Sequence, residues 1–287
     1  MGSPERDNTR EVREATNSPG YILGYNITTD NNEKDLRNTI WTHLDQLYRQ
    51  ESQDYEKLKA NMAVKVEIED KSPDFSNDEA ENYYEVPIRW NDLNIDPNHW
   101  NEKVKRYSAV FNENNDLLEG TASFNVNLVR TISVDTEGRE VAYNTLSFRL
   151  ILSAQTMADD GMMLPLHKSW QGHSIGDLPS DEDVIAVAHE ISQMLSALRM
   201  APVAESYTGP ALLAPEAAGV FFHEIFGHRI EGARLKKETD AQTFKKKVGE
   251  RVLPKHFSVT FDPNEKYYKG KPIAGYYPVD DEGIKGQ

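Results

Sequence analysis

Two histidines and a glutamate in the last third of the chain could bind a metal ion. His223, Glu224 and His228 form an H-E-x-x-x-H cluster. Neutral imidazoles bind divalent metals, and a carboxylate next to the first histidine can accept a proton from a metal-activated water, as in zinc hydrolases. The cluster therefore predicts a metal site that cleaves a bond by hydrolysis, and a peptidase is the first hypothesis.

The spacing of the two histidines predicts an irregular helix. In the common H-E-x-x-H motif the histidines are four residues apart, about 40° around a regular helix, whereas five residues correspond to about 140°. His223 and His228 can share one ion only if the helix widens or ends between them, and Gly227 would permit such a distortion. Glu231 could then be a further ligand or the residue that orients the His228 ring.

A chance pair of hydrogen-bonded core histidines is the alternative. The flanking residues are apolar and predict a buried helix, in which unpartnered polar side chains would be costly, so the sequence favours a metal. His189-Glu190 also begins such a motif, but Met194 stands where a second histidine would be needed, and a surface pair is expected. The other histidines lack ligand spacing and receive no role: His43, His99, His167, His173 and His256.

The composition predicts a folded, acidic protein. The chain has 287 residues, of which 38% are hydrophobic and 28% charged, enough to bury a substantial core. Its formal net charge of -15 repels phosphate backbones and anionic lipids, so we expect no nucleic-acid partner. No apolar run of about 18 residues occurs, so no membrane span is expected. The chain has no cysteine, which excludes disulfides and thiolate ligands within it.

The first half of the chain predicts a helix-and-sheet domain. Residues 1–32 are expected to be a mobile lead that includes a first strand at 21–28. Apolar residues at helical spacing predict a helix over 33–58, and alternation predicts a strand at 62–69. Residues 70–98 are acidic, and we expect long loops around a short strand there.

The next hundred residues predict the rest of that domain, which should span 33–200. We expect a helix at 101–112, two strands at 123–133 and 139–154 joined by a turn at 135–138, an irregular connection at 161–179 and a helix at 180–200. Ser180 is the expected N-cap of the last helix, since acidic residues and an apolar stripe follow it.

Residues 201–287 predict the beginning of a second, β-rich domain that carries the metal-binding helix. A short buried strand is expected at 211–214, and Pro215 should open a helix that extends to 230. The remainder, 231–287, has the composition of loops. The predicted fold class is therefore α+β, or mixed α/β.

Ala217–Gly232 resembles the TldD/PmbA family of metallopeptidases, on the TldD side, and Asp135–Gly138 and Pro278–Gly283 are more distantly similar. The resemblance implies that His223 and His228 bind zinc and that Glu224 is the general base. It also implies an unstructured peptide as substrate, drawn into a closed dimer formed with a second copy or with a paralogue. A cytoplasmic location is implied as well.

The chain departs from the family pattern at two points. Arg229-Ile230 replaces the usual Gly-Leu, which could alter the mouth of the site. Family members are longer and supply a cysteine as third ligand from their C-terminal part, so we expect this chain to be the N-terminal portion of a longer protein, inactive when alone. Because the polar start could replace a native leader, a periplasmic or secreted location stays open. The competing hypotheses are a binding or scaffold fragment, a partner subunit of a peptidase complex, and a hydrolase of non-peptide amides or esters.

Overall fold

The computed structural model describes residues 27, 32–62, 79, 82–232, 243–280 and 283–286. The chain has a mixed α+β fold, as predicted, and it divides into two compact units. The first unit combines residues 1–78 with 209–258, and the second combines 79–208 with 259–287. The strands expected at 21–28 and 62–69 lie almost entirely outside the described residues. The predicted domain boundaries stay a prediction.

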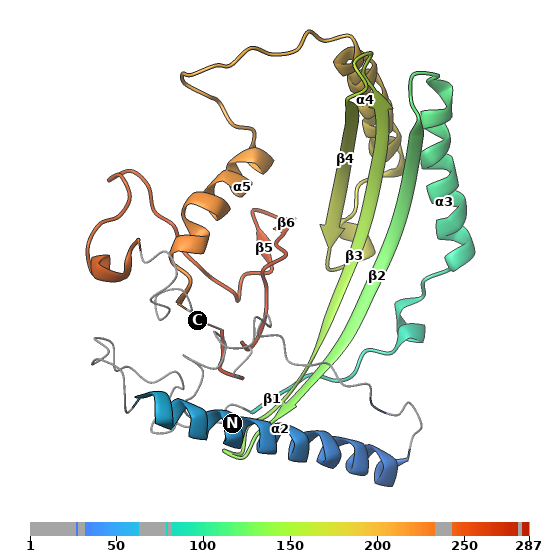
Figure 1. Cartoon of the computed structure of the whole chain (residues 1–287). Helices are drawn as coiled ribbons and strands as arrows, with labels where there is room; N and C mark the ends of the chain where they lie inside the picture. Colours follow the sequence, from blue (N-terminus) through green and yellow to red (C-terminus); the bar gives the residue numbers. More distant parts are fainter. Residues whose placement is uncertain are drawn as a thin grey trace. The chain divides into compact units, whose positions relative to one another are not determined.

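The first unit contains two α-helices among its described residues (Figure 1). Helix α2 spans Glu33–Met62 and confirms the predicted helix. Acidic residues in its first turn and Lys59 in its last turn match the helix dipole. Helix α5 spans Pro215–Ile225 and is followed by two short 3₁₀ helices, η4 at Gly227–Arg229 and η5 at Lys245–Lys247.

The second unit is built on a long antiparallel sheet (Figure 1). Strand β3 (Glu140–Met157) pairs along one edge with β2 (Glu119–Val134). Along its other edge, β3 pairs antiparallel with β4 (Met163–Gly172) and parallel with the short β1 (Asn82–Tyr84). The remaining elements are η1 (Trp90–Leu93), η2 (Val110–Glu113), η3 (Ile175–Asp177), and the two-residue strands β5 (Tyr267–Tyr268) and β6 (Lys271–Pro272).

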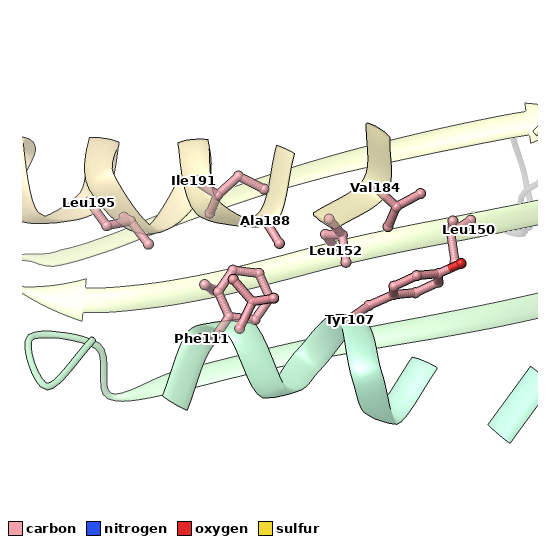
Figure 2. Close-up of a cluster of buried hydrophobic side chains, with 10 residues drawn as sticks. Tyr107, Phe111, Leu150, Leu152, Val184, Ala188, Ile191 and Leu195 are labelled. Carbon is pink, nitrogen blue, oxygen red and sulfur yellow. The ribbon is translucent and has the colours of Figure 1, made fainter. Parts of the chain in front are cut away.

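Helices α3 (Pro97–Ala109) and α4 (Asp181–Arg199) pack against the sheet and form the core of the second unit. From Phe148 to Thr156, alternate residues of β3 are buried, as the two-residue period of a strand requires when one face is covered. Figure 2 shows the buried side chains of β3, α4 and the α3–η2 segment pointing toward one another. The core cluster comprises Tyr107, Val110, Phe111, Leu150, Leu152, Ala154, Val184, Ala188, Ile191 and Leu195.

Most of the predicted elements of this unit are confirmed. The turn at 135–138 joins β2 to β3, with Gly138 at a φ of 92°. Ser180 caps α4 by accepting a hydrogen bond from the backbone N–H of Asp183 at 3.2 Å. Helix α3 begins earlier than predicted, because Asp96 caps it and Pro97 occupies its first turn.

The secondary structure predicted for two segments of the chain is wrong. The connection expected at 161–179 contains β4, and Pro165 lies within that strand opposite Gln155. A proline is tolerated there because, among the described residues, β4 pairs with β3 on one side only. The buried strand expected at 211–214 is irregular, exposed chain, and Leu212 is fully exposed.

None of the helices in the described ranges combines the length and apolar character that a membrane span requires.

Candidate metal centre

Helix α5 ends between the two histidines of the cluster. Pro215 and Glu216 occupy its first turn, and the backbone N–H of Ala218 donates to the carbonyl of Ala214 at 2.8 Å. The last regular bond joins the N–H of Phe226 to the carbonyl of Phe222 at 3.0 Å. Phe226 then leaves the helical conformation, with φ -124° and ψ -52°, and the chain continues as η4. The irregular helix predicted at 223–228 is therefore confirmed, although the helix stops short of residue 230.

The end of the helix brings the three cluster residues together. One potential ligand atom from each of His223, Glu224 and His228 lies within 4.8 Å of the other two. The carboxylate of Glu224 lies 3.9 Å from the Nε2 atom of each imidazole, and the two ring centroids are 4.4 Å apart. Among the residues that the structure describes, no other group of three such side chains meets this criterion.

Gly227 is less constrained than its expected role suggests. A Cβ atom placed there would lie 3.9 Å from both the Nδ1 atom of His223 and the carbonyl oxygen of Phe222. These are ordinary van der Waals distances, and the φ of Gly227 lies outside the region reserved for glycine. The turn from α5 into η4 therefore does not require a glycine at this position.

Glu231 fixes the second histidine. The Nδ1 atom of His228 lies 2.6 Å from the Oε1 atom of Glu231. When Nδ1–H donates to the carboxylate, the lone pair of Nε2, which faces Glu224, is free to bind a metal. This is one of the two roles considered for Glu231 from the sequence.

The expectation of a buried helix is wrong. No described residue of α5 is buried, and the side chains of His223 and Glu224 are each 62% exposed. Within the described part of the first unit, two aromatic contacts hold the site helix: Phe222 with Phe257 at 5.7 Å and Phe226 with Phe244 at 5.8 Å between ring centroids. The cost of burial thus gives no argument for a metal here, whereas the convergence of the three side chains does.

The donor set fits a divalent ion such as zinc. Zinc–ligand bonds of about 2.0–2.1 Å place tetrahedral ligand atoms roughly 3.3 Å apart, so the present spacing of up to 4.8 Å requires only side-chain rotation. Exposed side chains can make that adjustment. Two imidazoles leave coordination positions for a third ligand and for water, but the chain has no cysteine to supply a thiolate.

No other histidine among the described residues is part of the metal cluster. His189 and Glu190 are both exposed on α4, as expected for a surface pair. The Nε2 atom of His173 lies 3.0 Å from the carbonyl oxygen of Ile273, within the second unit. The contacts of Phe244 and Phe257 could not be predicted from the sequence, because ring pairs distant in sequence leave no periodic pattern.

Comparison with known proteins identifies the part of the chain that carries the cluster. Residues 206–287 match the sequence model of the PmbA/TldA metallopeptidase C-terminal domain. Over this segment the chain is similar to the TldD/PmbA family of metallopeptidases. A metalloprotease of Archaeoglobus fulgidus is 30% identical over 100 residues, which are 35% of this chain and 22% of the relative. Metalloprotease MJ0996 of Methanocaldococcus jannaschii is 41% identical over 76 residues, 26% of this chain and 15% of the relative.

This similarity confirms the resemblance inferred from the cluster, over this part of the chain. The matched range contains His223, Glu224, His228 and Glu231. The matching family model and both relatives carry the name of metallopeptidases or metalloproteases, a name that implies a metal cofactor in those proteins. The aligned segments span about a fifth or less of the two relatives.

Proposed function

We propose that the protein is a zinc-dependent peptidase of the TldD type, in which His223 and His228 bind the zinc ion and Glu224 is the general base. The observation that carries the proposal is the convergence of these three side chains within 4.8 Å where α5 ends. The match of residues 206–287 to a metallopeptidase family supports it. Zinc is favoured because two imidazoles are ligands that it commonly takes in hydrolases.

The chemistry follows from the position of Glu224. Bound zinc would supply a Lewis acid that makes water more acidic and polarises the scissile carbonyl. Glu224 lies 3.9 Å from the Nε2 atom of each histidine, so its carboxylate can take a proton from the attacking water and return it to the leaving amine. Glu231 keeps the His228 ring in the tautomer that leaves Nε2 unprotonated.

The third ligand and the substrate belong to the same proposal. Because this chain has no cysteine, a thiolate ligand would have to come from residues outside it. The substrate is an unstructured peptide, which can reach side chains as exposed as His223 and Glu224 in extended form. A dimer with a second copy or a paralogue would enclose the site and exclude folded proteins, and we propose a cytoplasmic location.

The competing proposal is a binding or scaffold protein with an incomplete metal site. It is favoured by the exposure of the cluster, which among the described residues offers no potential ligand beyond His223, Glu224 and His228. A peptide would then bind without being cleaved.

Metal analysis separates the two proposals. For the full-length protein we expect one zinc ion per polypeptide after zinc loading and removal of excess metal, measured by inductively coupled plasma mass spectrometry, together with cleavage of an unstructured peptide. His223→Ala and His228→Ala should lose both the zinc and the cleavage. His189→Ala is the matched control, since that exposed histidine on α4 also precedes a glutamate. A wild-type protein that binds peptide but holds no zinc would support the scaffold.

A further inference from the structure

A short basic segment accompanies the site helix. Residues 243–258 contain one acidic side chain, Glu250, in a protein whose net charge is -15. Their basic side chains are Lys245, Lys246, Lys247, Arg251 and Lys255. The local charge is therefore opposite to that of the protein as a whole.

The two ends of this basic segment contact α5 and Phe226, the residue directly after it. Near the start of the segment, the ring of Phe244 contacts that of Phe226 at 5.8 Å, and near its end Phe257 contacts Phe222 at 5.7 Å. Phe222 directly precedes His223 in the sequence. Figure 1 shows the segment looping beside α5. The basic side chains are thus carried by the same unit as the metal cluster and next to its helix.

The basic segment is folded, and part of its positive charge is exposed and not paired with an acidic side chain. The backbone N–H of Lys247 donates to the carbonyl of Phe244 at 2.9 Å, and Gly249 turns the chain with a φ of 82°. Lys247 pairs with Glu250 at 2.8 Å. Lys246, Arg251 and Lys255 are exposed and make no ion pair within the described part of the chain. These three cations are therefore open to a ligand.

We propose that the basic segment selects acidic peptides, by pairing its exposed cations with aspartate or glutamate side chains of a peptide bound at the metal cluster. The inference rests on the proposed function and adds a substrate class to it. An acidic peptide is repelled by the rest of the protein, so local attraction at this segment would guide it toward α5. Screening limits that attraction to about 8 Å at physiological ionic strength, so it acts on peptide residues that lie close to these cations. A nucleic acid is less favoured, because its many phosphates would meet the acidic remainder of the chain.

Peptide binding tests the proposal without requiring turnover. The probes are a fluorescent glutamate-rich peptide and its glutamine counterpart of the same length, and their Kd values are measured by anisotropy with full-chain Glu224→Gln protein to prevent cleavage. We expect the acidic peptide to bind about threefold to tenfold more tightly at low ionic strength, as a few exposed ion pairs allow. The preference should disappear in about 1 M salt, where the Debye length is about 3 Å.

Charge-matched variants then localise the effect. The double variant Lys246→Gln with Lys255→Gln should reduce the preference to less than about twofold. The control variant Lys34→Gln with Lys271→Gln removes the same charge from exposed positions outside the basic segment and should keep the preference. Equal Kd values for the two peptides, an equal loss in the control, or tighter binding of a single-stranded oligonucleotide than of the acidic peptide would overturn the proposal. Absence of zinc or of cleavage would contradict the proposed function and leave this binding test readable.

Discussion

The Nδ1 atom of His228 lies 2.6 Å from the Oε1 atom of Glu231, three residues further along the chain. This contact joins a residue of η4 to the residues that follow it, where α5 has already ended. The two glutamates of the site thus contact different atoms. Glu231 contacts the Nδ1 atom of one imidazole, whereas the carboxylate of Glu224 lies 3.9 Å from the Nε2 atom of each, which is consistent with the separate roles proposed for them.

Glu231→Gln should weaken zinc binding without abolishing it. The amide of glutamine no longer provides a carboxylate for the His228 Nδ1–H, and loss of such a partner typically lowers metal affinity about 10- to 100-fold. Competition with a chelating dye measures the zinc Kd. Glu190→Gln, at an exposed position on α4, is the control. An unchanged zinc affinity in Glu231→Gln would show that this contact does not tune the site.

Leu152→Ala should strongly destabilise the second unit. Leu152 is completely buried in the core between β3, α3 and α4, and truncation of such a leucine costs about 2–5 kcal/mol. Urea unfolding measures the loss. Leu212→Ala, at a fully exposed position, should change the free energy of unfolding by less than about 0.5 kcal/mol. Similar losses in the two variants would contradict the described core.

Gly283→Ala should destabilise the segment that carries the Pro278–Gly283 motif. Gly283 has a φ of 77°, and a Cβ atom there would lie 2.6 Å from the Cδ atom of Arg139. Backbone strain and this clash together should cost about 1–3 kcal/mol in urea unfolding. Gly275→Ala is the control, because a Cβ atom there meets nothing within 4 Å. Equal stability of the two variants would place residue 283 away from Arg139.

Asp181 stabilises the second unit at neutral pH, and this contribution should be lost in acid. Partial burial raises the pKa of its carboxyl, but hydrogen bonds from Lys103, Tyr107 and Arg106 outweigh burial and lower this pKa to about 2. A lowered pKa in the folded state stabilises the protein above the ordinary value of 3.8, and this stability is lost as the pH falls toward about 2.

Asp181→Asn tests this relationship. At pH 7 the variant should be less stable by about 1 kcal/mol, because the side chain is partly solvated and its ion pairs are screened. The difference from wild type should shrink between about pH 4 and pH 2. Glu102→Gln, which removes an exposed pair with Lys105, should show no such dependence. A difference that stays constant from pH 7 to pH 2 would contradict the lowered pKa.

Local chemistry explains which elements could be predicted from the sequence. Ser180 and the acidic residues after it mark the start of α4, and alternation identifies β2 and β3 on either side of the turn at 135–138. Strand β4 was missed because Pro165 interrupts its pattern, and the position of a strand within a sheet decides whether proline is tolerated.

The candidate site was predictable for a similar reason. The five-residue spacing of His223 and His228 cannot bring both rings together on a regular helix, so the sequence predicts a helix that widens or ends between them, and in the structure α5 ends there. The exposure of α5 could not be predicted from the sequence, because the apolar composition of a helix does not reveal how much of its surface other residues cover. The aromatic contacts of Phe222 and Phe226 depend on the path of the chain between distant residues.

Substitution of the general base tests the central claim most directly. In Glu224→Gln, the zinc content should equal that of the wild type, since both histidines remain, while cleavage of an unstructured peptide should fall to the background rate. Both quantities are measured on the same zinc-loaded full-length protein, by mass spectrometry of the metal and of the peptide products. Bound zinc without turnover is the result that the account predicts. Peptide cleavage by Glu224→Gln at the wild-type rate would contradict it.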